Sequence, residues 1–154
     1  MSIMPKNLKN KEVFKKSERL YLRSQVQQLF EKGKSFKVFP FRVVFLIHSD
    51  NKNGKDAPLS PSIELLISVS KHRFKKAVDR NRIKRLIRES YRRHEGRHLL
   101  YKEINTPPLH LSFALIVLTQ SLPTFSEVDL AMGRVLCRLQ KAVEKHTSKE
   151  GEAI

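Results

Sequence analysis

The run LHLSFALIVLT at residues 109–119 most strongly constrains how this chain can fold. It has the length of a β-strand and is almost continuously apolar. It lacks the alternation of apolar and polar residues that marks a strand with one solvated face. We therefore expect a central strand of a sheet that is buried on both faces.

Two further strands and three helices are expected around it. FPFRVVFLIH (39–48) and SIELLISVS (62–70) are rich in β-branched and apolar residues, which favours strands. Helical periodicity indicates helices over 24–33, from about 77 to about 96, and over 126–146. For the last helix we expect Ser126 and Asp129 to form the N-terminal cap. Its buried stripe is predicted to consist of Val128, Met132, Val135, Leu139 and Val143.

The order helix, strands, helix, strand, helix predicts an α+β sandwich, a sheet with helices on one side. Parallel pairing of strand 62–70 with strand 109–119 around the middle helix would form a βαβ unit. With 154 residues the chain suits one domain, which we place at 17–146. We expect a flexible basic arm at 1–16, a mobile loop at 49–61 and a disordered tail at 147–154.

The compartment is predicted from cysteine usage and hydropathy. The single cysteine, Cys137, cannot form an internal disulfide, which favours a reducing environment. The N-terminus is charged from Lys6 onward, and no apolar run is long enough to cross a membrane. We expect a cytoplasmic protein without a membrane association.

The net charge of +16 is far more than solubility requires, and it is confined to two segments. Residues 1–37 carry ten Lys or Arg against three acids, and residues 71–97 carry twelve against three. The remaining residues carry nine of each sign. This distribution predicts a polyanionic partner, with nucleic acid ahead of a membrane surface.

The helix that begins near Ala77 carries the most concentrated charge. Its side opposite the apolar residues has cations at steps of four, Arg80, Lys84, Arg88 and Arg92, with Asn81 and Arg85 beside them. Like charges at this spacing destabilise a helix by roughly 0.2–0.5 kcal/mol per pair. Glu89 is expected to relieve Arg85 and Arg93, which leaves the stripe without an acidic neighbour. Because the planar guanidinium suits phosphate, we interpret the stripe as a phosphate-binding surface and not as a solvated face.

The segment SVSKHRFKKAVDRNRIKRLIRESYR (68–92) resembles the signature of the bacterial ribonuclease P protein family. That signature is a Lys-containing strand end followed by A-V-x-R-N-R-x-K-R-x-x-R-E on a helix. The matching positions are Lys71, Ala77, Val78, Arg80, Asn81, Arg82, Lys84, Arg85, Arg88 and Glu89. A weaker similarity links ERLYLRSQVQQLFEKGKSF (18–36) to the N-terminal Arg-Leu, short helix and Gly turn of the family's sequences. The resemblance as a whole extends over about 14–145.

The resemblance implies an α-β-β-β-α-β-α sandwich of a type shared with a ribosomal-protein domain. It also implies a left-handed βαβ crossover, whereas about 98% of crossovers are right-handed. It further implies a non-catalytic protein subunit that assists a catalytic RNA, which uses Mg²⁺, in removing the 5′ leader from precursor tRNA. The implied partners are that RNA and the leader, without an obligate protein partner and without a cofactor on the protein itself.

The resemblance also implies two groups of site residues. The first would contact the catalytic RNA and comprises Arg80, Asn81, Arg82, Lys84, Arg85, Arg88 and Lys71. The second would line or adjoin a cleft for the leader and comprises Phe30, Phe36 and Val26, with Val26 standing where many relatives have an aromatic residue.

Two other function classes stay open. A different structural RNA-binding protein, such as a ribosomal or assembly protein, would explain the charge alone. A protein-only nuclease would need grouped carboxylates or histidines for metal ions. The acids are scattered, and His94 and His98 suggest no third ligand, so we expect neither a metal site nor catalytic residues.

Overall fold

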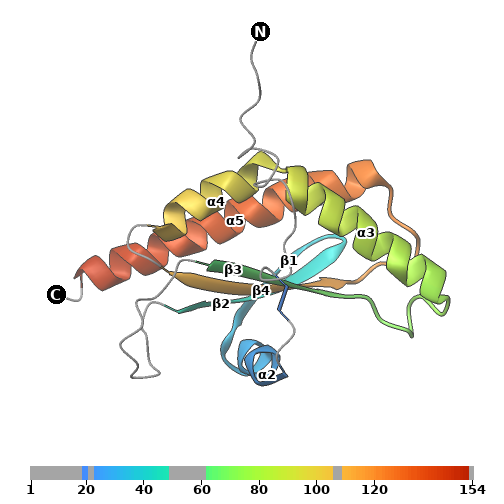
Figure 1. Cartoon of the computed structure of the whole chain (residues 1–154), viewed down its shortest axis with the longest axis horizontal. Helices are drawn as coiled ribbons and strands as arrows, with labels where there is room; N and C mark the ends of the chain where they lie inside the picture. Colours follow the sequence, from blue (N-terminus) through green and yellow to red (C-terminus); the bar gives the residue numbers. More distant parts are fainter. Residues whose placement is uncertain (1–18, 21–22, 49–61, 106–108, 153–154) are drawn as a thin grey trace, which may run out of the picture.

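The computed structural model describes residues 19–20, 23–48, 62–105 and 109–152. The predicted arm at 1–16 and the predicted loop at 49–61 lie outside the described residues. Figure 1 shows one sheet between a layer of three helices and a single helix. The elements are α2 (Arg23–Lys32), β1 (Lys34–Val38), β2 (Phe41–His48), β3 (Ser62–Ser68), α3 (Ala77–Arg93), α4 (Glu95–Asn105), β4 (His110–Val117) and α5 (Phe125–Glu152).

The sheet has the strand order β1-β2-β4-β3, which confirms that the apolar run forms an inner strand. β2 pairs with β1 and with β4 in antiparallel fashion, whereas β3 and β4 are parallel. The last pair, with α3 and α4 between its strands, is the predicted βαβ unit. The left-handed sense of its crossover stays a prediction of the family resemblance.

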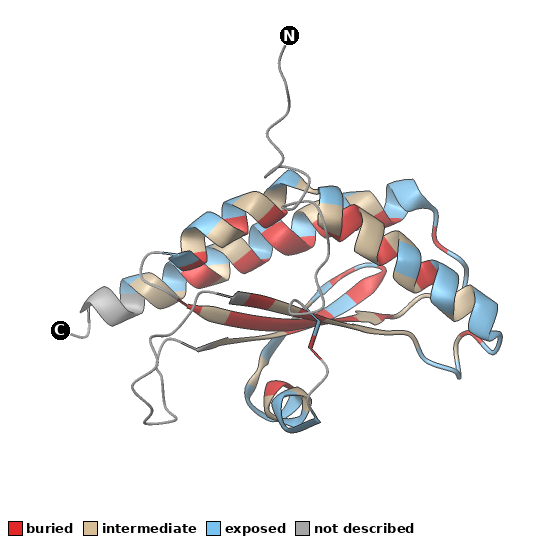
Figure 2. Ribbon diagram, viewed as in Figure 1, coloured by how far each residue is buried: buried red, intermediate tan, exposed pale blue. Residues whose placement is uncertain are grey.

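The two faces of the sheet bury different clusters. Leu111, Phe113 and Leu115 of β4 belong to the large core beneath α3, α4 and α5. Ala114, the intervening residue, packs with Leu29 of α2 in a smaller cluster on the opposite face. Figure 2 shows the buried residues concentrated in the sheet and on the inner sides of the helices.

The prediction of helices on one side of the sheet holds for α3, α4 and α5 but is wrong for α2, which lies across the sheet from them (Figure 1). The physical reason is that β2 and β4 present apolar side chains to both faces. Val44 and Ala114 point away from the three-helix layer and are covered by the fully buried Leu29 and by Leu20. Without α2 this second apolar surface would meet water.

The middle helix ends earlier than predicted and is followed by a helix that the pattern did not predict. His94 is extended (φ −75°, ψ 134°), so α3 stops at Arg93 and α4 begins at Glu95. The backbone N–H of Gly96 donates to Nδ1 of His94 at 3.1 Å, which satisfies one of the free donors at the start of α4. Leu100 and Ile104 of α4 are fully buried.

The C-terminal helix has the predicted stripe but different ends. All five predicted residues, Val128, Met132, Val135, Leu139 and Val143, are fully buried. The predicted cap is wrong, because Oγ1 of Thr124 accepts the N–H of Glu127 at 3.2 Å and so caps the helix. Asp129 instead accepts a hydrogen bond from Ser90 of α3 at 2.7 Å. α5 extends to Glu152, beyond the predicted end at 146, so 147–152 are helical and not a disordered tail.

Candidate nucleic-acid interface

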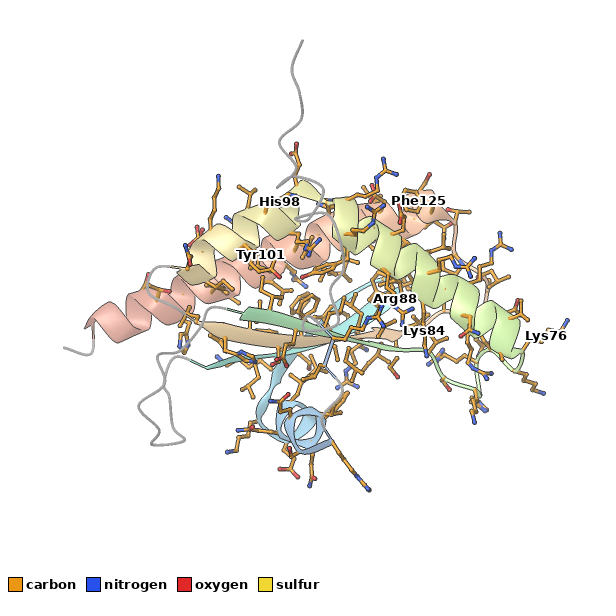
Figure 3. The ribbon with its side chains drawn as sticks, in the orientation of Figure 1. Lys76, Lys84, Arg88, His98, Tyr101 and Phe125 are labelled. Atoms are coloured by element: carbon orange, nitrogen blue, oxygen red, sulfur yellow. The ribbon has the colours of Figure 1, made fainter. Side chains whose placement is uncertain are left out.

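Helix α3 has one buried face and one basic face. Ile83, Ile87, Ser90 and Tyr91 are buried against the core. The basic face borders a surface hollow of about 410 Å³, which we call the α3 patch. Its lining residues are Asn81, Lys84, Arg85, Arg88, Glu89 and Arg92. In Figure 3 the side chains of Lys84 and Arg88 project from the same part of α3.

Four of the predicted RNA-binding residues are brought together in this patch: Asn81, Lys84, Arg85 and Arg88. Arg82 is exposed on α3 but does not line the hollow. Lys71 is exposed in the turn that precedes α3. Four of the seven predicted residues therefore line one patch, and three cations, Arg80, Arg82 and Lys71, do not line it.

Arg80 turns back toward the chain that precedes its helix. One guanidinium nitrogen (Nη1) donates to the carbonyl of Phe74 at 2.8 Å and to that of Lys75 at 3.0 Å. These carbonyls belong to the turn between β3 and α3, so Arg80 holds that turn against the first turn of the helix. In this conformation Arg80 does not line the patch. It instead fixes the turn from which α3, and with it the patch, begins.

The same turn is fixed from the other side by Arg73. Its guanidinium donates to the carbonyl of Leu118, at the end of β4. The side chain of Phe74 is buried, and its N–H donates to the carbonyl of Ser70 at 3.0 Å. Neither Arg73 nor Phe74 was predicted to matter, and the turn that sets the start of α3 depends on both.

The expectation that the α3 stripe has no acidic neighbour is wrong at its end. Oε1 of Glu89 lies 2.6 Å from Nη2 of Arg92 and 3.7 Å from Nη1 of Arg93. The first pair is spaced i, i+3, which places side chains on the same helix face as well as i, i+4 does. Glu89 therefore neutralises the C-terminal end of the stripe, and the uncompensated charge lies between Asn81 and Arg88.

Arg88 is the most unusual cation of the patch. Burial, and then the charge of Arg19, lower the pKa of its guanidinium. Its Nε is buried and finds no hydrogen-bond acceptor in the described part of the chain. A cation that is partly desolvated beside a second cation is stabilised by any anion that binds there.

Arg19 reaches Arg88 because the chain before α2 runs along the outer edge of the sheet. Arg19 forms a parallel bridge with Leu65 of β3, and the N–H of Leu20 donates to the Leu65 carbonyl at 3.0 Å. One cation of the first basic segment, Arg19, thus lies near the α3 patch of the second. The sequence gives no signal of this proximity, since it depends on pairing over 46 positions between Arg19 and Leu65.

The predicted cleft residues divide between the two faces of the sheet. Phe30 of α2 is 45% exposed, and Val26 packs against the cluster of Leu29, Val44 and Ala114. Phe36 of β1 lies on the opposite face, where its ring centre is 5.8 Å from that of Phe45. The structure therefore places Phe30 and Val26 on α2, which covers one face of the sheet. Phe36 lies on the opposite face and is not brought together with them.

Within the described ranges no group of three or more His, Cys, Asp or Glu residues could hold a metal ion. His94, one of the two histidines considered above, uses its Nδ1 to accept the Gly96 N–H.

Among the helices that the structure describes, none is both long enough and apolar enough to cross a membrane.

The fold and the α3 patch together define an α+β protein with a concentrated basic surface on one helix. Comparison with known proteins makes this specific: the ribonuclease P family model matches residues 14–140. The chain belongs to the ribonuclease P protein family. Proteins of this family take part in the 5′ processing of tRNA as components of a ribonucleoprotein with endoribonuclease activity, and this chain shares that role.

Three relatives support the assignment. The chain is 40% identical over 124 residues to the ribonuclease P protein component of Porphyromonas gingivalis. The aligned region covers 80% of this chain and 84% of the relative. The structure of the ribonuclease P protein from Thermotoga maritima matches with a TM-score of 0.54 at 27% identity, covering 79% of this chain and 96% of that one. A structure of the Staphylococcus aureus protein matches with a TM-score of 0.52 at 27% identity, covering 79% and 94%.

Proposed function

We propose that this chain is a non-catalytic subunit that binds the catalytic RNA of ribonuclease P through the α3 patch and holds the 5′ leader of precursor tRNA against the α2 side of the sheet. The chemistry of cleavage belongs to the RNA and to the Mg²⁺ that it binds. The proposed place of action is the cytoplasm, where precursor tRNA is made in bacteria.

The observation that carries this proposal is the α3 patch. Lys84, Arg85 and Arg88 stand around one hollow, and the guanidinium of Arg88 keeps a buried donor without an acceptor in the described chain. Phosphate oxygens supply both the missing acceptor and the missing negative charge. Neutralising phosphates with Lys and Arg releases counterions, which is the main source of affinity for RNA.

The proposal for the leader depends on the α2 face. Phe30 is a large aromatic side chain with 45% of its surface exposed, one helical turn along α2 from Val26, which packs against the apolar cluster. An exposed aromatic ring offers a stacking surface for an unpaired base, whatever its identity. Phe36 is not part of this proposal, because it lies on the other face.

One feature of the α3 patch supports a non-catalytic polypeptide. The acids of the α3 patch reduce to Glu89, whose carboxylate is engaged by Arg92 at 2.6 Å. Metal-dependent hydrolysis by a protein needs several oxygen or nitrogen ligands around one ion. The proposed contribution of the chain is electrostatic: it lowers phosphate repulsion and so favours the Mg²⁺-bound form of the RNA.

The decisive experiment measures cleavage of a precursor tRNA by the cognate catalytic RNA at low Mg²⁺, with and without the protein. We expect the protein to raise the rate, and to raise it less for a precursor whose leader is shortened to one nucleotide. The protein without RNA should leave the substrate intact. Equal rates with and without protein would refute the proposal, and cleavage by the protein without RNA would refute its non-catalytic role.

A further inference from the structure

A second basic hollow lies away from the α3 patch, between α5 and the β1–β2 edge of the sheet. Its volume is about 440 Å³, and it shares no residue with the α3 patch. In Figure 1, α3 and the C-terminal part of α5 lie toward opposite ends of the helical layer. The lining residues, which we call the α5 hollow, are Lys32, Lys34, Phe36, Phe45, Leu46, Ile47, Arg138, Lys141, Ala142, Lys145 and His146.

The charge of the α5 hollow has a single sign. Five lining residues carry a permanent positive charge, and none is Asp or Glu. Two acids are sequence neighbours of lining residues but do not line the hollow themselves. Glu31 accepts a hydrogen bond from Gln27 at 3.0 Å, and Glu144 is exposed. Cations gathered around one hollow repel one another and oppose folding, unless an anion occupies the space between them.

The floor of the hollow is aromatic. Phe36 and Phe45 meet with ring centres 5.8 Å apart, and the guanidinium carbon of Arg138 lies 5.1 Å from the centre of the Phe36 ring. Arg138 also donates to the carbonyl of Lys37 at 3.3 Å, so its planar group is held over the ring from two directions. Both a phenyl ring and a guanidinium plane are surfaces on which unpaired bases stack.

A step in the sheet opens the hollow. β1 begins at Lys34, which pairs with Phe45 of β2, so Leu46 and Ile47 extend beyond the first strand. Lys32 and Lys34 stand at this step, and Lys141 and Lys145 face it from α5 one helical turn apart. Cations on both sides of an apolar floor suit a ligand with charged edges and flat apolar groups.

We propose that the α5 hollow binds a segment of single-stranded RNA, as an RNA contact separate from the α3 patch. This inference rests on the proposed function, since it assigns a second contact to the same class of partner. Phosphates lie against Lys34, Lys141 and Lys145, and a base lies on the stack of Arg138 and Phe36. An acidic peptide would satisfy the charges but would leave this stacking surface unused.

The test measures binding of a fluorescein-labelled oligonucleotide of ten uridines to the full chain by fluorescence anisotropy, over a series of salt concentrations. Every protein tested carries the substitutions R82A/R85A, which reduce RNA binding at the α3 patch. In this background we expect K141A/K145A to lower the slope of log affinity against log salt by about 1.4, about 0.7 for each lost phosphate contact on a single strand.

The matched control is K102A/R134A, which removes the same charge from exposed positions of α4 and α5 outside the hollow. We expect its slope to equal that of the R82A/R85A protein. With 5-iodouridine in the oligonucleotide, photo-crosslinks should map to residues 34–47 or 138–146.

Equal slopes for K141A/K145A and K102A/R134A, or crosslinks only elsewhere, would overturn the inference. Tighter binding of a ten-residue glutamate peptide than of the RNA would also overturn it, in favour of an acidic protein partner. The readout is binding and not cleavage. RNA-dependent cleavage stimulated by the protein, together with equal slopes, would therefore remove the α5 hollow and leave the proposed function standing.

Discussion

The guanidinium carbon of Arg97 lies 5.1 Å from the ring centre of Tyr91, and both side chains are buried in the layer of α3, α4 and α5. Arg97 also faces the ring of Tyr101 at 5.7 Å and donates to the carbonyl of Arg92 at 3.2 Å. A fully buried arginine is uncommon in a domain of this size. Two aromatic faces and a helix C-terminal carbonyl supply the negative electrostatic potential that it needs.

Arg97→Ala should therefore lower the free energy of unfolding by about 3 kcal/mol. The loss combines a desolvated cation–π contact, a charged hydrogen bond and a cavity between α3 and α4. Urea denaturation followed by circular dichroism measures it. The neighbouring Arg93→Ala is the control, since that side chain is 65% exposed and its loss should cost about 0–1 kcal/mol. Equal losses in the two variants would show that burial of Arg97 contributes little.

A second prediction concerns the contact of α4 with α5 at Gly96. A Cβ placed there would lie 2.9 Å from Cβ of Leu136, so the two helices would have to separate. We expect Gly96→Ala to destabilise the protein by about 1–3 kcal/mol through overpacking. Thermal denaturation of the variant beside the parent protein measures the effect.

Gly133→Ala provides the comparison in α5. Its Cβ would meet only the side chain of His94, with the nearest atom, Nε2, at 3.0 Å. A side chain can move, and alanine favours a helix over glycine by about 1 kcal/mol. The stability should stay within about 1 kcal/mol of the parent. A larger loss at Gly133 than at Gly96 would contradict this account of helix packing.

A third prediction concerns the hydrogen bond from Ser90 to Asp129, which joins α3 to α5 at 2.7 Å. Ser90 is fully buried, so Ser90→Ala removes the donor without opening the site to water. We expect a loss of about 1–2 kcal/mol of unfolding free energy. The double variant with Asp129→Ala should cost less than the sum of the single changes, and an additive result would show that the two groups act independently.

Much of the fold could be predicted because its signals are local. The apolar run at 109–119 gave β4 its inner position, and the stripe of α5 was predicted residue by residue. Helix α4 also has a local signal, since Leu100 and Ile104 are spaced i, i+4 and both are buried. It was missed because Gly96 was interpreted as a helix end, whereas its missing side chain lets α4 pack closely on α5.

The site could be predicted only in part, because its remaining features depend on tertiary structure. The cations of α3 lie within one short segment of the sequence and form a patch as expected. The face on which Phe36 lies depends on the register of β1 against β2, where it pairs with Val43 of the main core. The α5 hollow joins Lys32 and Lys34 to cations more than 100 positions later, in a part of the chain whose charges balance.

The last prediction separates two arginines of the family signature by what they contact. Arg85 is exposed and lines the α3 patch, so Arg85→Ala should lower the salt slope of binding to the catalytic RNA by about 0.7–0.9. Its unfolding free energy should change by less than about 0.5 kcal/mol, as for most surface substitutions.

Arg80 instead donates to the carbonyls of Phe74 and Lys75. Arg80→Ala should therefore lower the unfolding free energy by about 1.5–3 kcal/mol, as expected for lost hydrogen bonds from a charged group. Affinity for the RNA should fall because the turn before α3 loosens, while the salt slope stays within about 0.3 of the parent value, well below one phosphate contact. Filter binding over a salt series and urea denaturation measure the two effects on the same samples. A full drop of the slope with unchanged stability would show that Arg80 leaves the turn and binds phosphate directly.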